Sequence, residues 1–174
     1  ALPASTLTTD GSLVFQGTQI QIFPPPALPP LLEARLGDEG VQAVLDLAET
    51  AGLLQPQRDY GQPSVADATT TVVEVHADGE RFVQEIYALG AEVVGPPGAD
   101  APGPAPGVTE EQRGRRDEVQ AFASALSTPE ALVDGTVEVT PYRPDAFAIR
   151  AVAVDPGVAP TGGIEADVRD WPLP

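Results

Sequence analysis

The 174-residue sequence contains no cysteine, methionine, lysine or asparagine, and it has one histidine, His76. Without cysteine the chain can form no disulfide and can supply no thiol nucleophile. Because a zinc site of the HExxH type needs two histidines, the single imidazole excludes every site built from several histidines of this chain. We therefore predict neither a metal site nor a cofactor site.

Positive charge is also scarce. Nine basic residues, all arginine, stand against 26 acidic residues, which gives a formal net charge of −17 and a pI of about 4.1. A field of this sign repels the phosphate backbone of nucleic acids and anionic lipid head groups. No apolar run reaches the length of about 18 residues that a membrane-spanning helix requires. We expect no nucleic-acid partner and no membrane-spanning segment.

Hydrophobic residues make up 42% of the chain, which is above the level of disordered proteins, although 20 prolines and 17 glycines indicate long irregular stretches. A chain of this length can bury a core of its own. The patterns described below place its elements in the order ββ-α-ββ-α-ββ. They predict a single α+β domain over residues 1–174, with an antiparallel sheet built from hairpins and two helices packed on one face.

The clearest pattern is a β-hairpin over residues 69–87. Two segments rich in β-branched and aromatic residues flank Asp78-Gly79, a pair typical of two-residue hairpin turns. This turn predicts three facing pairs on the side that packs on a helix: Val75 with Phe82, Val73 with Gln84, and Thr71 with Ile86.

The opposite face of this hairpin is predicted to be polar and exposed. This polar face, the exposed proline-rich segments and the absence of a catalytic set favour binding over catalysis. We predict a partner-binding face composed of Glu74, His76, Arg81, Glu85 and Tyr87.

Two further hairpins are expected. Leu13, Phe15, Ile20 and Ile22 alternate around Gln16-Gly17-Thr18, which predicts a strand pair over residues 12–23. Residues 136–140 and 146–154 are predicted to pair around the turn that contains Pro141 and Pro144, with four inward residues: Val137, Val139, Phe147 and Ile149.

Two helices are expected between the hairpins. The first covers residues 38–52, with Asp38 as its cap and Gly52 at its end. The second begins at Thr109, which forms a capping box with Gln112 and precedes a buried stripe. That stripe is predicted to contain Val119, Phe122, Ala123 and Leu126. Thr128-Pro129-Glu130 predicts one more short turn.

Three segments lack any regular pattern. The proline-rich connector 24–30 is expected to run as polyproline II, because proline fixes φ and removes a donor. Residues 95–108 consist almost entirely of glycine, proline, alanine and aspartate, which predicts a mobile loop. The tail 155–174 is expected to be irregular, with Trp171 docked on the domain because a lone indole gains from burial.

Candidate catalytic groups are few. None of the five serines lies in a GxSxG turn, and Glu74 with Glu85 resembles a glycosidase carboxylate pair only in residue type. One alternative function is a carboxylate-dependent hydrolase that uses Asp67 or Glu74 with His76. Another is a small-ligand carrier. We predict no catalytic residues.

A local resemblance bears on function. One part of the chain contains a helix, the motif Asp59-Tyr60-Gly61, residues 65–71 and a hairpin that ends at Gly90. Together these features resemble uncharacterised exported or lipoprotein-type domains of actinobacteria. The likeness covers residues 38–90, and it implies export by secretion or a lipid anchor, although this sequence has no cysteine to carry a lipid. We expect a non-catalytic extracytoplasmic binding or structural domain whose partner is a protein or a cell-envelope component.

Overall fold

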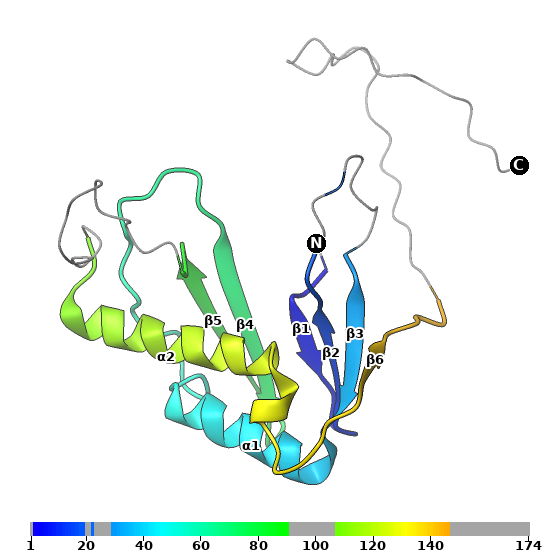
Figure 1. Cartoon of the computed structure of the whole chain (residues 1–174). Helices are drawn as coiled ribbons and strands as arrows, with labels where there is room; N and C mark the ends of the chain where they lie inside the picture. Colours follow the sequence, from blue (N-terminus) through cyan, green and yellow to red (C-terminus); the bar gives the residue numbers. More distant parts are fainter. Residues whose placement is uncertain (1, 20–21, 23–28, 91–106, 147–174) are drawn as a thin grey trace, which may run out of the picture. The chain divides into compact units, whose positions relative to one another are not determined.

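The computed structural model describes residues 2–19, 22, 29–90 and 107–146. By its contacts the chain divides into two compact units, Ala1–Arg143 and Pro144–Pro174. Every helix and strand of the described residues belongs to the first unit. In chain order they are β1 (Ser5–Leu7), β2 (Ser12–Gln16), β3 (Leu31–Arg35), α1 (Gly37–Thr50), β4 (Thr70–Ala77), β5 (Glu80–Tyr87), α2 (Glu110–Leu126), the 3-10 turn η1 (Pro129–Ala131) and β6 (Val139–Pro141) (Figure 1).

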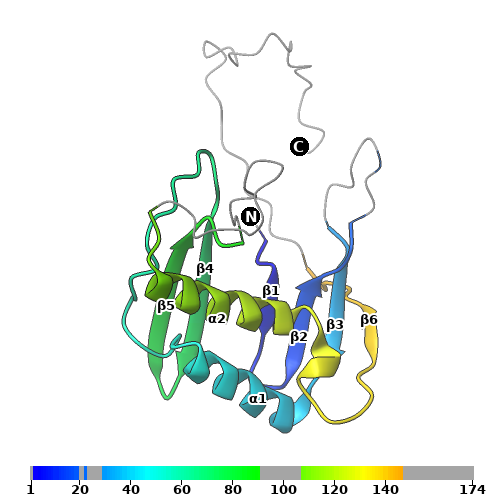
Figure 2. The same ribbon diagram turned by 60° about the vertical axis from the view of Figure 1, so that its left-hand side comes forward.

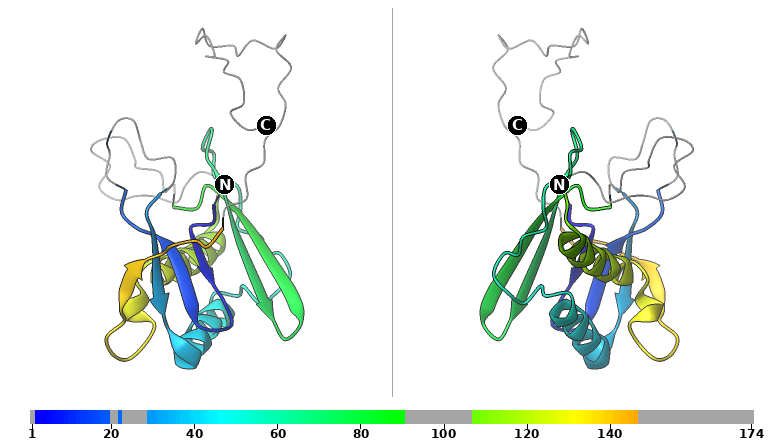
Figure 3. Two further views of the ribbon diagram at one scale, coloured as in Figure 1. Left: turned by 90° about the vertical axis from the view of Figure 1, so that its right-hand side faces the viewer. Right: turned by 90° about the vertical axis from the view of Figure 1, so that its left-hand side faces the viewer.

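The predicted α+β class is confirmed, and all of the strand pairs are antiparallel. The strands divide into two sheets rather than one: a four-stranded sheet in the order β1-β2-β3-β6 and a two-stranded sheet formed by β4 and β5. Figure 3 shows the β4-β5 hairpin as a ribbon separate from the four-stranded sheet. The packing of both helices on one face of a sheet stays a prediction, as does the single domain over residues 1–174.

The strand pair predicted within residues 12–23 is wrong. β2 pairs with β1 on one side and with β3 on the other, so both of its edges are occupied by strands that the alternation did not indicate. Ile22, which the alternation placed in the second strand of this pair, is 57% exposed. Leu13 and Phe15 belong to the buried core. These two residues pair with β1 and with β3, which follows the proline-rich connector.

The second predicted hairpin is corrected in part. A strand does form after residue 136, but it begins at Val139 and pairs with β3, through Ala34↔Val139 and Leu32↔Pro141. Val137 is buried and Val139 packs against the core, as predicted. Residues 147–154 lie outside the described residues, as do most of the connector 24–30, residues 95–106 of the predicted loop and the tail with Trp171.

Both helices form where they are expected, with one correction. α1 begins at Gly37, and its N-cap is Leu36, which makes no side-chain hydrogen bond, rather than the predicted Asp38. Asp38 lies in the first turn, where its carboxylate interacts favourably with the helix dipole. The chain leaves α1 through Gly52, whose φ of +66° is readily adopted only by glycine. α2 begins with the predicted capping box of Thr109 and Gln112.

The core is shared by both sheets and by α2. Leu13 of β2, Ile86 of β5 and Val119 of α2 are each fully buried, and they belong to one hydrophobic cluster. Burying such a side chain contributes about 1.5–3 kcal/mol. α1 and α2 contact each other and lie side by side in Figure 2. This packing holds the hairpin by its inner side and leaves its other side outward.

Candidate partner-binding surface

The β4-β5 hairpin has the predicted register. Val75 pairs with Phe82, Val73 with Gln84 and Thr71 with Ile86, and the two central turn residues, Asp78 and Gly79, both have positive φ, at 52° and 79°. Positive φ at both positions is the signature of the type I′ turn, which suits the twist of a hairpin. The turn chemistry therefore fixes which side chains share a face.

All five residues of the predicted partner-binding face lie on one side of the hairpin. We call this side the hairpin outer face, and alternation along the two strands assigns it eight residues: Thr70, Val72, Glu74, His76, Arg81, Val83, Glu85 and Tyr87. The prediction described this face as polar. The register also places two valines, Val72 and Val83, near the middle of this face, and Val72 is 56% exposed. The face is an apolar centre with a charged surround.

A charged cluster occupies the turn end of this face. Arg81 donates two hydrogen bonds of 2.8 Å to the two carboxylate oxygens of Glu74, and His76 Nε2 lies 2.7 Å from Glu74 Oε1. The hydrogen bonds from Arg81, followed by the one with His76, lower the pKa of Glu74 to about 2. The same interaction raises the pKa of Arg81. Glu74 is thus a fixed anion near neutral pH, and it is a poor proton acceptor.

The structure does not bring Asp67 and His76 together. The Tyr87 hydroxyl donates to Val65 O at 2.7 Å and accepts from Ala68 N at 3.4 Å, which places the segment around Asp67 beside the start of β4. At about 3.3 Å per residue, the strand from there to His76 is about 20 Å long. Asp67 and His76 therefore lie at opposite ends of the hairpin.

The two carboxylates that resemble a glycosidase pair are diagonal neighbours. Glu74 lies opposite Val83, and Glu85 lies opposite Val72. Arg81 already holds the Glu74 carboxylate, whereas no salt bridge involves Glu85 among the described residues. A retaining or inverting pair needs one carboxyl group with a raised pKa, and Glu74 is shifted in the opposite direction.

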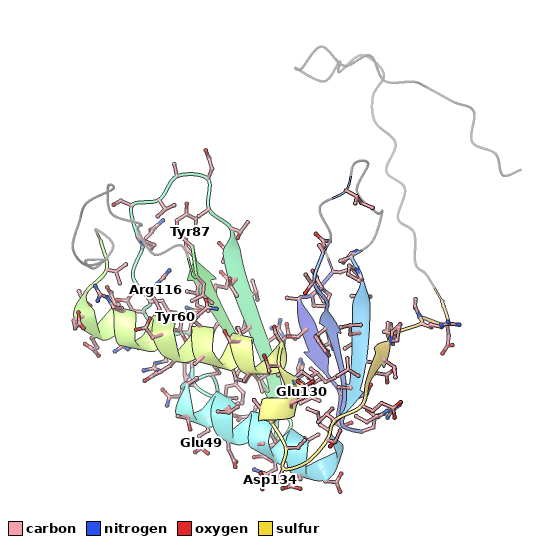
Figure 4. All side chains as sticks on the ribbon, viewed as in Figure 1. Glu49, Tyr60, Tyr87, Arg116, Glu130 and Asp134 are labelled. Atoms are coloured by element: carbon pink, nitrogen blue, oxygen red, sulfur yellow. The ribbon has the colours of Figure 1, made fainter. Side chains whose placement is uncertain are left out.

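Tyr87 has a structural role within the predicted face. Its ring is half-buried, and its hydroxyl fastens the segment before β4 through the two hydrogen bonds given above. On the neighbouring backbone, Arg116 of α2 donates to the carbonyls of Tyr87 and Ala88 at 2.9 and 2.6 Å, and to Tyr60 O at 3.3 Å. Figure 4 labels these three residues, Tyr60, Tyr87 and Arg116.

The inner face contains a residue whose importance the sequence pattern did not indicate. Gln84 is fully buried, and its amide makes four hydrogen bonds to the segment that leads to Tyr60. Oε1 accepts from Arg58 N at 2.9 Å and from the Tyr60 hydroxyl at 3.2 Å, while Nε2 donates to Gln55 O at 2.7 Å and Pro56 O at 3.3 Å. A polar residue at an inward position of an apolar face was the available signal.

The motif Asp59-Tyr60-Gly61, part of the resemblance noted above, is a structural junction. Asp59 accepts hydrogen bonds from Gly61 N at 2.9 Å and from Gln112 Nε2 at 2.8 Å, and these two bonds lower its pKa, in that order. Burial raises the pKa of Tyr60. The motif links the chain before the hairpin to the capping box of α2.

The described residues contain neither a metal-binding cluster nor a membrane-spanning helix. No group of three or more histidine, aspartate or glutamate side chains there could hold a metal ion. None of the helices in the same residues combines the length and the apolar character needed to cross a membrane. Comparisons with protein-family models, with curated proteins and with solved structures gave no match.

Proposed function

We propose that this chain is a non-catalytic extracytoplasmic binding domain whose partner, a protein or another cell-envelope component, contacts the hairpin outer face. The observation that carries the proposal is Val72, which is 56% exposed at the centre of that face. Valine favours a strand even where it is exposed, and an exposed apolar centre with a polar surround is also the usual anatomy of a protein interface. The extracytoplasmic location is supported by the resemblance of residues 38–90.

The charged cluster beside Val72 supports binding rather than catalysis. Its three members satisfy one another, and the low pKa of Glu74 makes its carboxylate unsuited to proton transfer near neutral pH. Fixed charges that need no reorganisation favour recognition of a complementary surface. The cluster gives the face a defined charge pattern.

A site-specific crosslinking experiment tests the proposal. A photoreactive amino acid replaces Glu85 on the outer face, and the control carries it in place of Glu130, an exposed acid of η1 that is labelled in Figure 4. Each protein is exposed to a cell-envelope fraction, and crosslinked products are identified by mass spectrometry. A specific product is expected only for position 85.

Affinity for the identified partner then gives the quantitative test. Glu85→Arg and Val72→Asp are expected to weaken binding by about tenfold or more, because both change the interface without removing a side-chain hydrogen bond of the fold. Glu130→Arg makes the same charge change elsewhere and should leave the affinity unchanged. Equal affinities for all three variants would refute the assignment of the face.

A further inference from the structure

The two edges of the hairpin differ in how they are covered. Because Asp78 and Gly79 form a two-residue turn, Ala77 and Glu80 make the first hydrogen-bonded pair, and bonded pairs alternate with unbonded pairs along the hairpin. The backbone groups of the unbonded residues point away from the partner strand. On β4 these residues are Thr70, Val72, Glu74 and His76.

The outward edge of β5 is engaged by side chains. The side-chain amide of Gln57 makes two hydrogen bonds with the backbone of Glu85: it donates to the carbonyl at 3.2 Å and accepts from the N–H at 2.7 Å. The Arg116 guanidinium donates hydrogen bonds to the carbonyls of Tyr87 and Ala88. Glu85 and Tyr87 are among the residues whose backbone groups the alternation directs to the outward edge of β5. Ala88 follows the strand.

The outward edge of β4 has no such cover within the described residues. No strand pairs with it, and no side chain there bonds the backbone of its four outward residues. Natural edge strands are blunted by charged side chains, above all lysine, by proline, by bulges or by short length. The one carboxylate of β4, Glu74, is paired with Arg81. β4 has eight residues without lysine or proline, and its register runs through eight pairs without a bulge. It is an edge competent to accept another strand.

We propose that this edge of β4 binds an extended cationic peptide segment, which adds to the hairpin as a third, antiparallel strand. The inference rests on the proposed function and specifies how the partner docks. Strand addition supplies main-chain hydrogen bonds, and alternating side-chain positions supply selectivity. Val73 and Val75 on one side of the edge are only partly buried, and Val72 on the other side is exposed, so apolar residues of the added strand gain cover on both sides.

Charge complementarity selects a cationic occupant. The hairpin carries four acids and one arginine, and Arg81 pairs with Glu74 alone. Asp78, Glu80 and Glu85 form no salt bridge among the described residues. A second copy of this chain would bring a net charge of −17 to the same edge, which disfavours self-pairing. Basic residues that alternate with apolar residues fit both the charge and the pleat.

The test uses a synthetic eight-residue peptide of alternating valine and arginine, with affinity measured by fluorescence anisotropy. Val72→Pro removes one outward N–H without touching the β4-β5 ladder. It is expected to weaken binding by up to about tenfold, the upper end of the effect of losing one strand hydrogen bond. An analogue with glutamate in place of arginine should not bind.

Ser5→Pro is the matched control. Thr8 N bonds Ser12 O and Gln16 N bonds Ala4 O, so bonded positions flank β1 at Ala4 and Thr8. By alternation the N–H of Ser5 points outward, on an edge of β1 that no strand of the described residues pairs with. This variant should bind the peptide as the parent does. Equal affinity of the parent and Val72→Pro, or an equal loss in Ser5→Pro, would overturn the proposal.

Hydrogen exchange of the parent protein supplies a readout that needs no variant. Amides of Val72, Glu74 and His76 should gain protection when the peptide is present, since strand pairing engages them. Unchanged protection at saturating peptide would overturn strand addition even if the peptide binds. Weakening by Glu85→Arg but not by Val72→Pro would likewise reject the edge while leaving the proposed binding function of the outer face intact.

Discussion

Replacement of Gln84 gives the sharpest test of how this fold is held together. Its side chain is fully buried, and it satisfies four polar groups of the segment from Gln55 to Tyr60. In Gln84→Ala the N–H of Arg58 and the hydroxyl of Tyr60 lose their acceptor. Water cannot replace that acceptor without entering the core.

The expected loss of stability follows from these contacts. A buried polar group left without a partner costs about 1–3 kcal/mol, and truncation of the side chain also leaves a cavity. We expect Gln84→Ala to lower the free energy of unfolding by about 3–5 kcal/mol. Gln84→Leu fills the space but leaves the same groups unsatisfied, so it should still cost about 2–4 kcal/mol.

Urea denaturation followed by far-ultraviolet circular dichroism measures the effect, and Gln57→Ala is the control. Gln57 also makes three hydrogen bonds, two of them to the Glu85 backbone, but it is exposed, and water can take its place. Its replacement should cost about 1 kcal/mol or less. A loss in Gln84→Ala no larger than that in Gln57→Ala would refute the reasoning from burial.

Two further predictions concern single interactions. The Glu74 carboxyl should titrate at about pH 2 by NMR and move toward its ordinary value in Arg81→Gln. Because its folded pKa lies below the unfolded value, its stabilising contribution is present above the unfolded pKa and is lost as the pH falls from there through about 2; a stability difference between parent and Arg81→Gln that stays constant over that window would contradict this. Thr109→Ala should cost about 1 kcal/mol by removing the capping box of α2, whereas Thr109→Ser keeps the hydroxyl and should be nearly neutral in the same urea assay.

Local chemistry made part of the fold predictable. Asp78-Gly79 fixed the turn type and therefore the register of the hairpin, and Thr109 with Gln112 fixed the start of α2. In both cases the determining residues lie within a few positions of the structure that they specify. The outer-face residues were predictable for the same reason, because a known register assigns every side chain to a face.

Pairing between distant strands was not predictable in this way. β2 alternates as a strand should, but nothing in its own residues says that β3, beyond the proline-rich connector, is its partner. β6 pairs with β3 across more than one hundred residues for the same reason. Register between strands far apart depends on which apolar faces the core can accommodate together.

The candidate site was predictable in composition but not in function. The sequence indicated which residues share the outer face, yet it did not show that the Tyr87 hydroxyl is committed to the segment before β4. The open edge of β4 depends on what pairs with the hairpin in three dimensions. The buried amide of Gln84 was hidden for a related reason, since its partners come from a segment without regular structure.

The turn at Asp78-Gly79 also restricts how this hairpin can change in length. Side chains alternate between the two faces of the hairpin. One residue added to each strand therefore moves the turn by one step, and every residue between the added pair and the turn changes to the opposite face. Two added residues in each strand restore the assignment. Insertions and deletions at this tip are therefore expected in steps of two per strand, and a protein engineer who extends it should keep to that step.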